Sequence, residues 1–125
     1  MVQQYLSITE NNLNIKNQIM KNKIVRISLG YFQPDQTAKV ASMLEGEFKK
    51  SLIPAIEKLK GNISYYVGID KEKHTLTNVS FWETDEDAKQ MATLKEMLDM
   101  RTTFEALGLK FIEITNQNIL WELSK

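Results

Sequence analysis

Two stretches of the chain match each other at an offset of fifty residues. The first runs from Phe32 to Lys39 and the second from Trp82 to Lys89, with Asp, Ala and Lys identical at matching places. In both stretches an aromatic residue ends an alternating segment, and an acidic residue then stands where a helix would begin. The repeat predicts a chain built from two strand–helix–strand halves, which restricts the possible folds more than any other feature.

The bulk composition predicts one globular domain. A chain of 125 residues with 42% hydrophobic residues is long enough to bury a core. Its formal net charge is zero, so neither nucleic acid nor a membrane surface is expected as a partner. Cysteine is absent, which excludes disulfides, thiol catalysis and cysteine-bound metal. With no visible secretory signal and no apolar run near the ~20 residues of a membrane span, we expect a cytoplasmic protein.

The N-terminal segment, residues 1–23, reads differently from the rest. It is rich in Asn and Gln, with scattered Leu and Ile. Met20 would serve as a natural protein start, so the segment is either a non-native extension or an arm that packs on a partner. Residues 24–125 are expected to form the single folded domain.

Alternation of apolar with polar or small residues predicts the strands. They are expected over residues 24–32, 62–70, 75–83, 109–115 and 119–123. With a helix in each half, the order is βαββαβ followed by a tail strand. This is the split βαβ, ferredoxin-like pattern, an α+β fold with both helices on one face of an antiparallel sheet.

Helix boundaries follow from a few residues with strong local preferences. Pro34 lies near a first helical turn, and Gly61 is expected to end the helix that follows. Pro54 should kink or restart that helix. Thr84 is a suitable N-cap for the second helix, which is expected to continue to a stop at Gly108.

The predicted sheet has two unlike faces. One is almost wholly apolar, with Val25, Ile27, Leu29, Tyr31, Ile63, Tyr65, Val67, Ile69, Val79 and Phe81. The other carries small, polar and aromatic residues, namely Arg26, Ser28, Gly30, Phe32, Ser64, Tyr66, Gly68, Asn78, Ser80 and Trp82. An apolar face of that size is unusual on a monomer. We therefore expect a two-fold homodimer that packs sheet on sheet.

The second face is the candidate functional site. Small residues such as Ser28 leave room that a packed core would fill. Asn78 and Trp82 are four apart on one strand and point to the same side, while Tyr66 and Arg26 could reach the same space. A cavity with a few convergent polar groups is the usual form of a small-molecule site. These donors suit a planar, oxygen-bearing aromatic ligand, whose enolate or phenolate they could stabilise.

Each candidate residue also has a structural interpretation. Trp82 could be a core anchor, Asn78 a satisfied structural amide, and Arg26 a partner in a salt bridge. Arg101, late in the second helix, could serve the negative end of the helix dipole. His74, the one histidine, is expected to be solvated in a charged turn. No nucleophile–base pair, glycine-rich phosphate loop or metal-ligand spacing is present, so no metal or other cofactor is expected.

The segment from Thr77 to Ala88, TNVSFWETDEDA, resembles the third strand and helix start of the antibiotic biosynthesis monooxygenase domain. The resemblance implies a dimeric α/β barrel of ferredoxin-like subunits over residues 24–123. Cofactor-independent members of that family oxidise anthrone-like polyketides with molecular oxygen. The implied activity is a monooxygenase that acts without metal or flavin on a small aromatic or polyketide-like molecule.

The resemblance also implies roles for residues. The family uses an Asn and a Trp four apart on this strand, which Asn78 and Trp82 match as catalytic residues. The side chains expected to bind substrate are Tyr66, Arg26, Phe32, Ser28 and Arg101. Ala88 stands near a further family Tyr, so that phenol is missing. The haem-degrading branch needs a histidine in the second helix, and none occurs between Thr84 and Gly108.

Three functions remain open from the sequence. The first is the cofactor-independent oxygenase. The second is a non-catalytic module that holds a small hydrophobic ligand in the same pocket. The third is a structural dimer whose cavity is filled by side chains.

Overall fold

The computed structural model describes residues 19–125. The N-terminal segment predicted as an extension therefore lies, for residues 1–18, outside the described residues. Its interpretation as a non-native start or a partner-packing arm stays a prediction, as does the domain boundary at residue 24.

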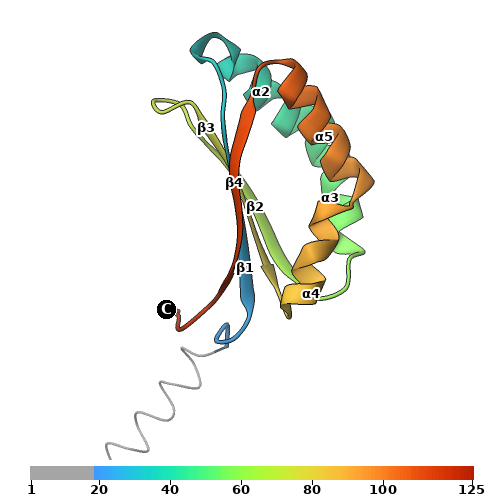
Figure 1. Ribbon diagram of the computed structural model, residues 1–125, viewed down its shortest axis with the longest axis vertical. Helices are drawn as coiled ribbons and strands as arrows, with labels where there is room; N and C mark the ends of the chain where they lie inside the picture. Colours follow the sequence, from blue (N-terminus) through green and yellow to red (C-terminus); the bar gives the residue numbers. More distant parts are fainter. Residues whose placement is uncertain (1–18) are drawn as a thin grey trace, which may run out of the picture.

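Four antiparallel strands form one sheet in the order β2-β3-β1-β4. Their bounds are Ile24–Tyr31 for β1, Asn62–Asp70 for β2, Thr75–Trp82 for β3 and Lys110–Asn118 for β4. The sheet curves around the helices, which cover one of its faces in the described part of the chain (Figure 1). The predicted α+β ferredoxin-like fold, with its two strand–helix–strand halves, is confirmed.

The first helical region is broken at Gly46, where the sequence predicted a break at Pro54. It comprises η1 (Pro34–Gln36), α2 (Thr37–Met43), η2 (Leu44–Phe48) and α3 (Lys49–Glu57). Within the π-helical turn η2, Gly46 has non-helical φ −98° and ψ −107°. Glycine tolerates such a conformation because it lacks a Cβ. Pro54 lies inside α3 on its exposed side, where water can satisfy the carbonyl group that it leaves free.

The second helical region begins at Thr84, as predicted. The Thr84 hydroxyl accepts a hydrogen bond from the backbone N–H of Asp87 at 3.0 Å, which makes it an N-cap. The region comprises α4 (Asp85–Ala88), η3 (Lys89–Ala92) and α5 (Lys95–Ala106). The single unbroken helix expected here is wrong, because Leu94 is extended and packs its side chain against the core. Gly108, at φ +90°, follows the end of α5 as expected.

The core lies between the helices and the sheet. Phe48 and Phe104 join the two helical regions in an edge-to-face contact, with ring centroids 5.1 Å apart. Burial of a large apolar side chain stabilises the fold by roughly 1.5–3 kcal/mol. The largest fully buried side chains are Trp82, Phe104, Ile56, Leu76, Met100 and Val40.

The faces of β1 and β3 are as the sequence predicted. Arg26 pairs with Ser80 and Ser28 with Asn78, so these four side chains share one side of the sheet. Along β3, every second residue from Leu76 is buried, which identifies that side as the one beneath the helices. The opposite side of β1 and β3 is the predicted apolar face.

The faces of β2 are opposite to the prediction. Tyr65 pairs with Ser80 and Tyr66 pairs with Val79, so Tyr65 faces the helices and Tyr66 faces away. Val67, paired with Asn78, also lies on the helix side. The register shifts at the start of β2, and both faces of the strand carry apolar or aromatic residues. Alternation alone therefore could not decide which face is buried.

The predicted fifth strand around Trp121 is also wrong. The strand β4 extends to Asn118, and residues 119–125 contain no strand. The Ile119 N–H donates to the Lys23 carbonyl at 2.9 Å, and the Asn22 N–H donates to the Ile119 carbonyl at 2.9 Å. The backbone bonds of Ile119 are thus satisfied by the segment just before β1 rather than by a sheet neighbour.

The turn before β2 gives the first testable prediction. Gly61 has φ +74°, and a Cβ there would lie 2.0 Å from Oδ2 of the buried Asp87. We expect Gly61→Ala to lower the free energy of unfolding by roughly 1–3 kcal/mol through backbone strain and the clash. Urea denaturation measures it. The control Gly68→Ala lies in β2 with nothing within 4 Å of the added Cβ and should cost little. Equal stability of both variants would contradict the geometry of this turn.

Candidate functional site

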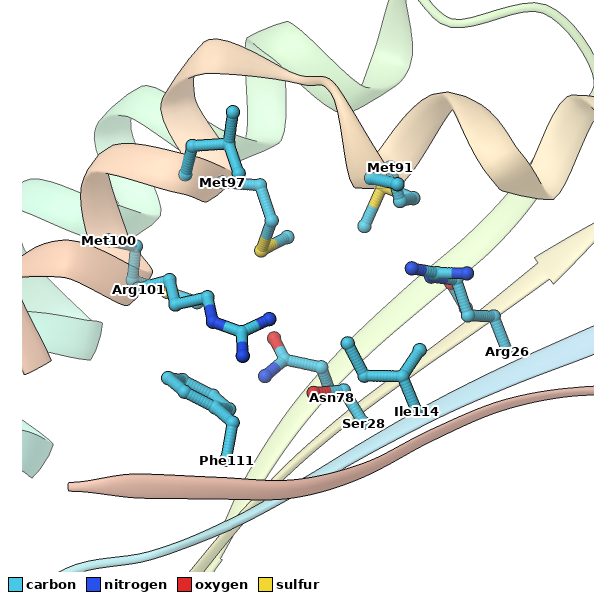
Figure 2. A pocket seen from close by; sticks show the side chains of 12 residues that line it. Arg26, Ser28, Asn78, Met91, Met97, Met100, Arg101, Phe111 and Ile114 are labelled. Atoms are coloured by element: carbon cyan, nitrogen blue, oxygen red, sulfur yellow. The ribbon is translucent and has the colours of Figure 1, made fainter. Parts of the chain in front are cut away.

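A cavity of about 120 Å³ lies between the sheet and the second helical region. Figure 2 shows its side chains converging from β1, β3 and β4 on one side and from η3 and α5 on the other. Its lining consists of Arg26, Ser28, Asn78, Ser80, Met91, Ala92, Met97, Leu98, Met100, Arg101, Phe111 and Ile114. The cavity is thus mostly apolar, with a few polar groups on the sheet side and from α5.

Asn78 is held in a fixed orientation at the floor of the cavity. Its side chain is 6% exposed, and its Oδ1 accepts a hydrogen bond from the Tyr65 hydroxyl at 2.5 Å. Burial raises the pKa of Tyr65, so its hydroxyl stays protonated and donates at neutral pH. With its carbonyl oxygen engaged, the Asn78 amide presents chiefly its N–H donors to the cavity.

Trp82 does not reach the cavity. Its indole is fully buried, and its Nε1–H donates to the Ser80 Oγ at 2.8 Å. Ser80 does line the cavity, and because its oxygen already accepts a bond from Trp82, its own O–H is left as a donor. Trp82 therefore acts on the site through Ser80 rather than by touching what the cavity holds.

Arg26 brings positive charge from β1. Its Nη1 donates to the Asn116 Oδ1 at 3.0 Å, which is a neutral partner. Burial lowers the pKa of Arg26, and the carboxylate of Asp85 opposes that change to a smaller extent. The salt bridge predicted as an alternative for Arg26 is not among the ion pairs of the described residues.

Arg101 brings a second positive charge from α5. Its Nε donates to the Glu105 carboxylate one turn further along, at 2.7 Å. Its guanidinium carbon lies 5.1 Å from the ring centroid of Phe111, within range of a cation–π contact. In Figure 2 the guanidinium extends from the helix toward the sheet, where Asn78 and Ser28 stand.

The structure brings together four of the seven side chains proposed from the sequence. Asn78, Arg26, Ser28 and Arg101 all line the cavity. Tyr66 does not, and its expected place beside Asn78 is wrong: it is 61% exposed on the opposite face of the sheet. The residue that contacts Asn78 is its neighbour, Tyr65.

Phe32 also lies away from the cavity. It is buried in the core just beyond β1, with its ring edge-to-face against His74 at a centroid distance of 6.1 Å. The sequence predicted a solvated His74, and the structure differs from that prediction. It is half-buried, and its Nδ1 is buried with no hydrogen-bond partner among the described residues. The positive φ of +55° at His74 turns the chain so that the ring folds back toward Phe32.

Several lining residues were not identified as site residues from the sequence. Met91, Met97 and Met100 line the cavity from η3 and α5, and Phe111 and Ile114 line it from β4. The methionines have the helical spacing of core residues. Spacing alone cannot distinguish a side chain that fills the core from one that borders a cavity. Met100 does both, since it is only 1% exposed.

Over residues 19–125, no group of three His, Cys, Asp or Glu side chains is arranged to hold a metal ion. Within the same residues, no helix has the length and apolar character needed to cross a membrane. The absence of a cofactor remains a prediction from the sequence.

A second hollow of about 530 Å³ lies between β2 and the first helical region. Apolar side chains such as Phe48, Leu52 and Ile53 line it. Its charged residues, Glu45, Lys49 and Lys71, are all exposed to solvent. Tyr65 also lines it, but its buried hydroxyl already donates to Asn78. The smaller cavity, where Asn78 keeps free donors, is therefore the better candidate site.

Comparison with solved structures identifies the fold. A candidate antibiotic biosynthesis monooxygenase from Deinococcus radiodurans superposes with a TM-score of 0.60 at 14% identity, over 82% of this chain and 97% of that one. Another from Chloroflexus aurantiacus J-10-fl gives 0.54 at 18% identity, over 78% and 93% of the two chains. These likenesses show that the chain has the fold of antibiotic biosynthesis monooxygenase-like proteins.

A third similar structure has a named activity. SnoaB, a cofactor-independent oxygenase from Streptomyces nogalater solved as an asparagine-to-alanine mutant, gives a TM-score of 0.54 at 9% identity, over 78% of this chain and 93% of that one. A scan against protein-family models found no match. A search of curated proteins found no match either. At such low identities the comparisons establish the fold alone.

The Tyr65–Asn78 bond gives the second prediction. Tyr65→Phe removes the hydroxyl that donates to Asn78, and we expect a loss of about 1 kcal/mol in unfolding free energy at neutral pH. Because burial raises the folded pKa of Tyr65, its stabilising effect is complete below about pH 10 and is lost as the pH rises above that value.

The variant should therefore lose less stability than the wild type when the pH is raised above about 10. Urea denaturation at pH 8 and at pH 10.5 measures this difference. Tyr66→Phe is the matched control, since Tyr66 is the exposed neighbour on the opposite face. A parallel response of the two variants would argue against a buried Tyr65 donor.

Proposed function

We propose that the protein binds a small aromatic molecule in the cavity and oxidises it with molecular oxygen, without metal or flavin. Two facts support this proposal: the fold is shared with a cofactor-independent oxygenase, and the cavity is apolar with convergent donors. A cytoplasmic location and a homodimeric state belong to the same proposal.

The observation that carries the proposal is the orientation of the Asn78 amide. Tyr65 engages its carbonyl oxygen, so its N–H donors are available where a ligand oxygen would lie. Ser80 contributes an O–H donor on the same strand, and Arg101 contributes charge from the opposite wall. Fixed donors in a water-poor site stabilise an oxyanion without reorganising during the reaction.

The chemistry that suits these donors starts from an ionised phenol. A ring carbon para to the phenolate oxygen bonds to O2, and protonation gives a hydroperoxide. Loss of water then leaves a quinone, so phenol plus O2 yields quinone plus water. All electrons come from the substrate, which is consistent with a site that needs no cofactor. Asn78 and Ser80 would stabilise the negative charge as it moves from the phenolate to the bound oxygen.

A second candidate function is binding without catalysis, and one observation favours it. None of the lining side chains in the described chain can accept a proton at neutral pH, because the polar ones are two arginines, two serines and an asparagine. Trp82, a catalytic candidate from the sequence, gives its N–H to Ser80. The third possibility, a cavity filled by side chains, is less consistent with about 120 Å³ of free space.

The homodimer is supported by the outer face of the sheet, defined as the side away from the helices. It carries Val25, Ile27, Leu29, Tyr66, Val79 and Phe81, none of them fully buried. In the described chain no helix covers this face (Figure 1). Burying the same face of a second copy against it would form an isologous, two-fold interface.

The enzymatic proposal predicts oxygen consumption with electron-rich single-ring phenols, measured with an oxygen electrode and corrected for autoxidation. Asn78→Ala should lower the rate by about 10²-fold, as expected when an oxyanion donor is removed. Asn118→Ala, at the exposed end of β4, is the control and should keep the rate. Ligand retention in native mass spectrometry with no oxygen uptake from any phenol would favour the binding module.

The dimer proposal predicts a particle of twice the 14.5 kDa chain mass by light scattering. Ile27→Asp places a charge at the centre of the outer face and should yield monomers. Ile53→Asp, on α3, is the control because Ile53 is 44% exposed beside the second hollow. If Ile53→Asp dissociates the dimer and Ile27→Asp does not, the interface lies at α3 beside the second hollow and the proposed face is wrong.

A further inference from the structure

The chain contains only two arginines, Arg26 and Arg101, against fourteen lysines. Both arginines line the cavity, and no lysine does. They come from different halves of the fold, Arg26 from β1 and Arg101 from α5. Arginine differs from lysine in presenting a planar fork of donors that matches a carboxylate in two-point contact. Lysine supplies all of the other basic side chains, so the need for a soluble surface does not explain why both arginines line the cavity.

The charge of Arg26 is only partly compensated by the protein, because Asp85 acts on it without forming an ion pair. Its one hydrogen-bond partner, Asn116, is neutral, and burial lowers its pKa. Among residues 19–125 it forms no ion pair. A partly buried cation without a direct ion pair is costly, and an anionic ligand would relieve that cost.

Arg101 is preorganised rather than free. Glu105 holds its Nε, and the ring of Phe111 lies against its guanidinium. Its two terminal nitrogens are therefore left to bind in the direction that Figure 2 shows, toward the sheet. Fixing a side chain before binding reduces the entropy lost when a ligand is held.

The rest of the cavity sets the charge and size of the ligand. No aspartate or glutamate is among its lining residues, and Glu105 and Asp85, which act on the two arginines, lie outside the lining. Its volume of about 120 Å³ is close to the ~150 Å³ of an apolar cavity known to hold one benzene molecule. The geometry points to a single-ring aromatic carboxylate as the ligand, its carboxylate held by Arg26 and Arg101 and its ring among the methionines.

This inference rests on the proposed function for the site but can fail separately from it. Benzoate and benzamide have the same ring and nearly the same shape, and they differ in charge. Isothermal titration of the full chain with each should show benzoate binding at least tenfold more tightly. Equal affinity for the two would overturn the inference while leaving a small aromatic site in place.

Substitutions of single basic residues test which side chains hold the carboxylate. Arg26→Met and Arg101→Met should each weaken benzoate binding at least tenfold and leave benzamide unchanged. Lys110→Met removes a positive charge from β4 outside the cavity and should change neither. Thermal denaturation identifies any variant that fails to fold, and the comparison of the two ligands on the wild type needs no variant.

The remaining outcomes are also decisive. If neither compound binds the wild type, the carboxylate inference is wrong. If oxygen uptake from neutral phenols still occurs in that case, the proposed function stands without it. If benzoate binds but Lys110→Met weakens it as much as the arginine variants do, the effect is general surface attraction, and the two-arginine site is wrong.

Discussion

The site depends on two polar side chains buried in the middle of the sheet. Asn78 and Ser80 lie on the helix side of β3, where Leu76 and Trp82 on either side belong to the core. A buried amide or hydroxyl without a partner costs about 1–3 kcal/mol, so each needs a specific neighbour. Tyr65 supplies it for Asn78 and Trp82 for Ser80. Both partners approach from positions outside the cavity lining, and the remaining donors of Asn78 and Ser80 are thereby left for the cavity.

The sequence predicted the central strands well because their alternation is unambiguous. In β1 and β3 one face is apolar and the other is small or polar, and a shift by one residue would exchange the two faces and move Arg26 out of the cavity. The Thr84 cap was predicted equally well, since a hydroxyl followed by three acidic residues is typical of a helix N-terminus. The four side chains brought together in the cavity come from these segments and from α5.

The predictions from the sequence were wrong where two alternative local conformations have similar free energies. Tyr65 and Tyr66 are adjacent, equally aromatic, and differ only in which face they occupy, so the pairing with β3 decided between them. The helix break fell at Gly46 rather than at Pro54, because an exposed proline leaves its orphaned carbonyl to water. The cavity itself was not visible in the pattern, since methionines that line it and methionines that fill the core have the same helical spacing.

Local charge in this molecule differs from the net charge. Sixteen basic and sixteen acidic side chains give a neutral chain, which says nothing about any one cavity. Two acidic side chains outside the lining act on the cavity arginines: Glu105 pairs with Nε of Arg101, and Asp85 opposes the lowering of the Arg26 pKa. Both arginines of the chain line the cavity while no acidic residue does, a local arrangement that no count over the sequence could show.

The hydrogen-bond donors of the cavity bear on the missing proton acceptor. A catalytic base is required only if the substrate arrives protonated, and under the proposed function the donors of Asn78 and Ser80 would lower the pKa of a bound phenol by stabilising its anion. Ionisation could then pass the proton to solvent as the ligand binds, without a histidine or carboxylate in the lining. Under this scheme the rate would follow the pKa of the substrate phenol rather than that of any side chain. Under the proposed function, the lack of a base in the lining would then be explained by a substrate that is stabilised as its anion and reacts with O2 directly.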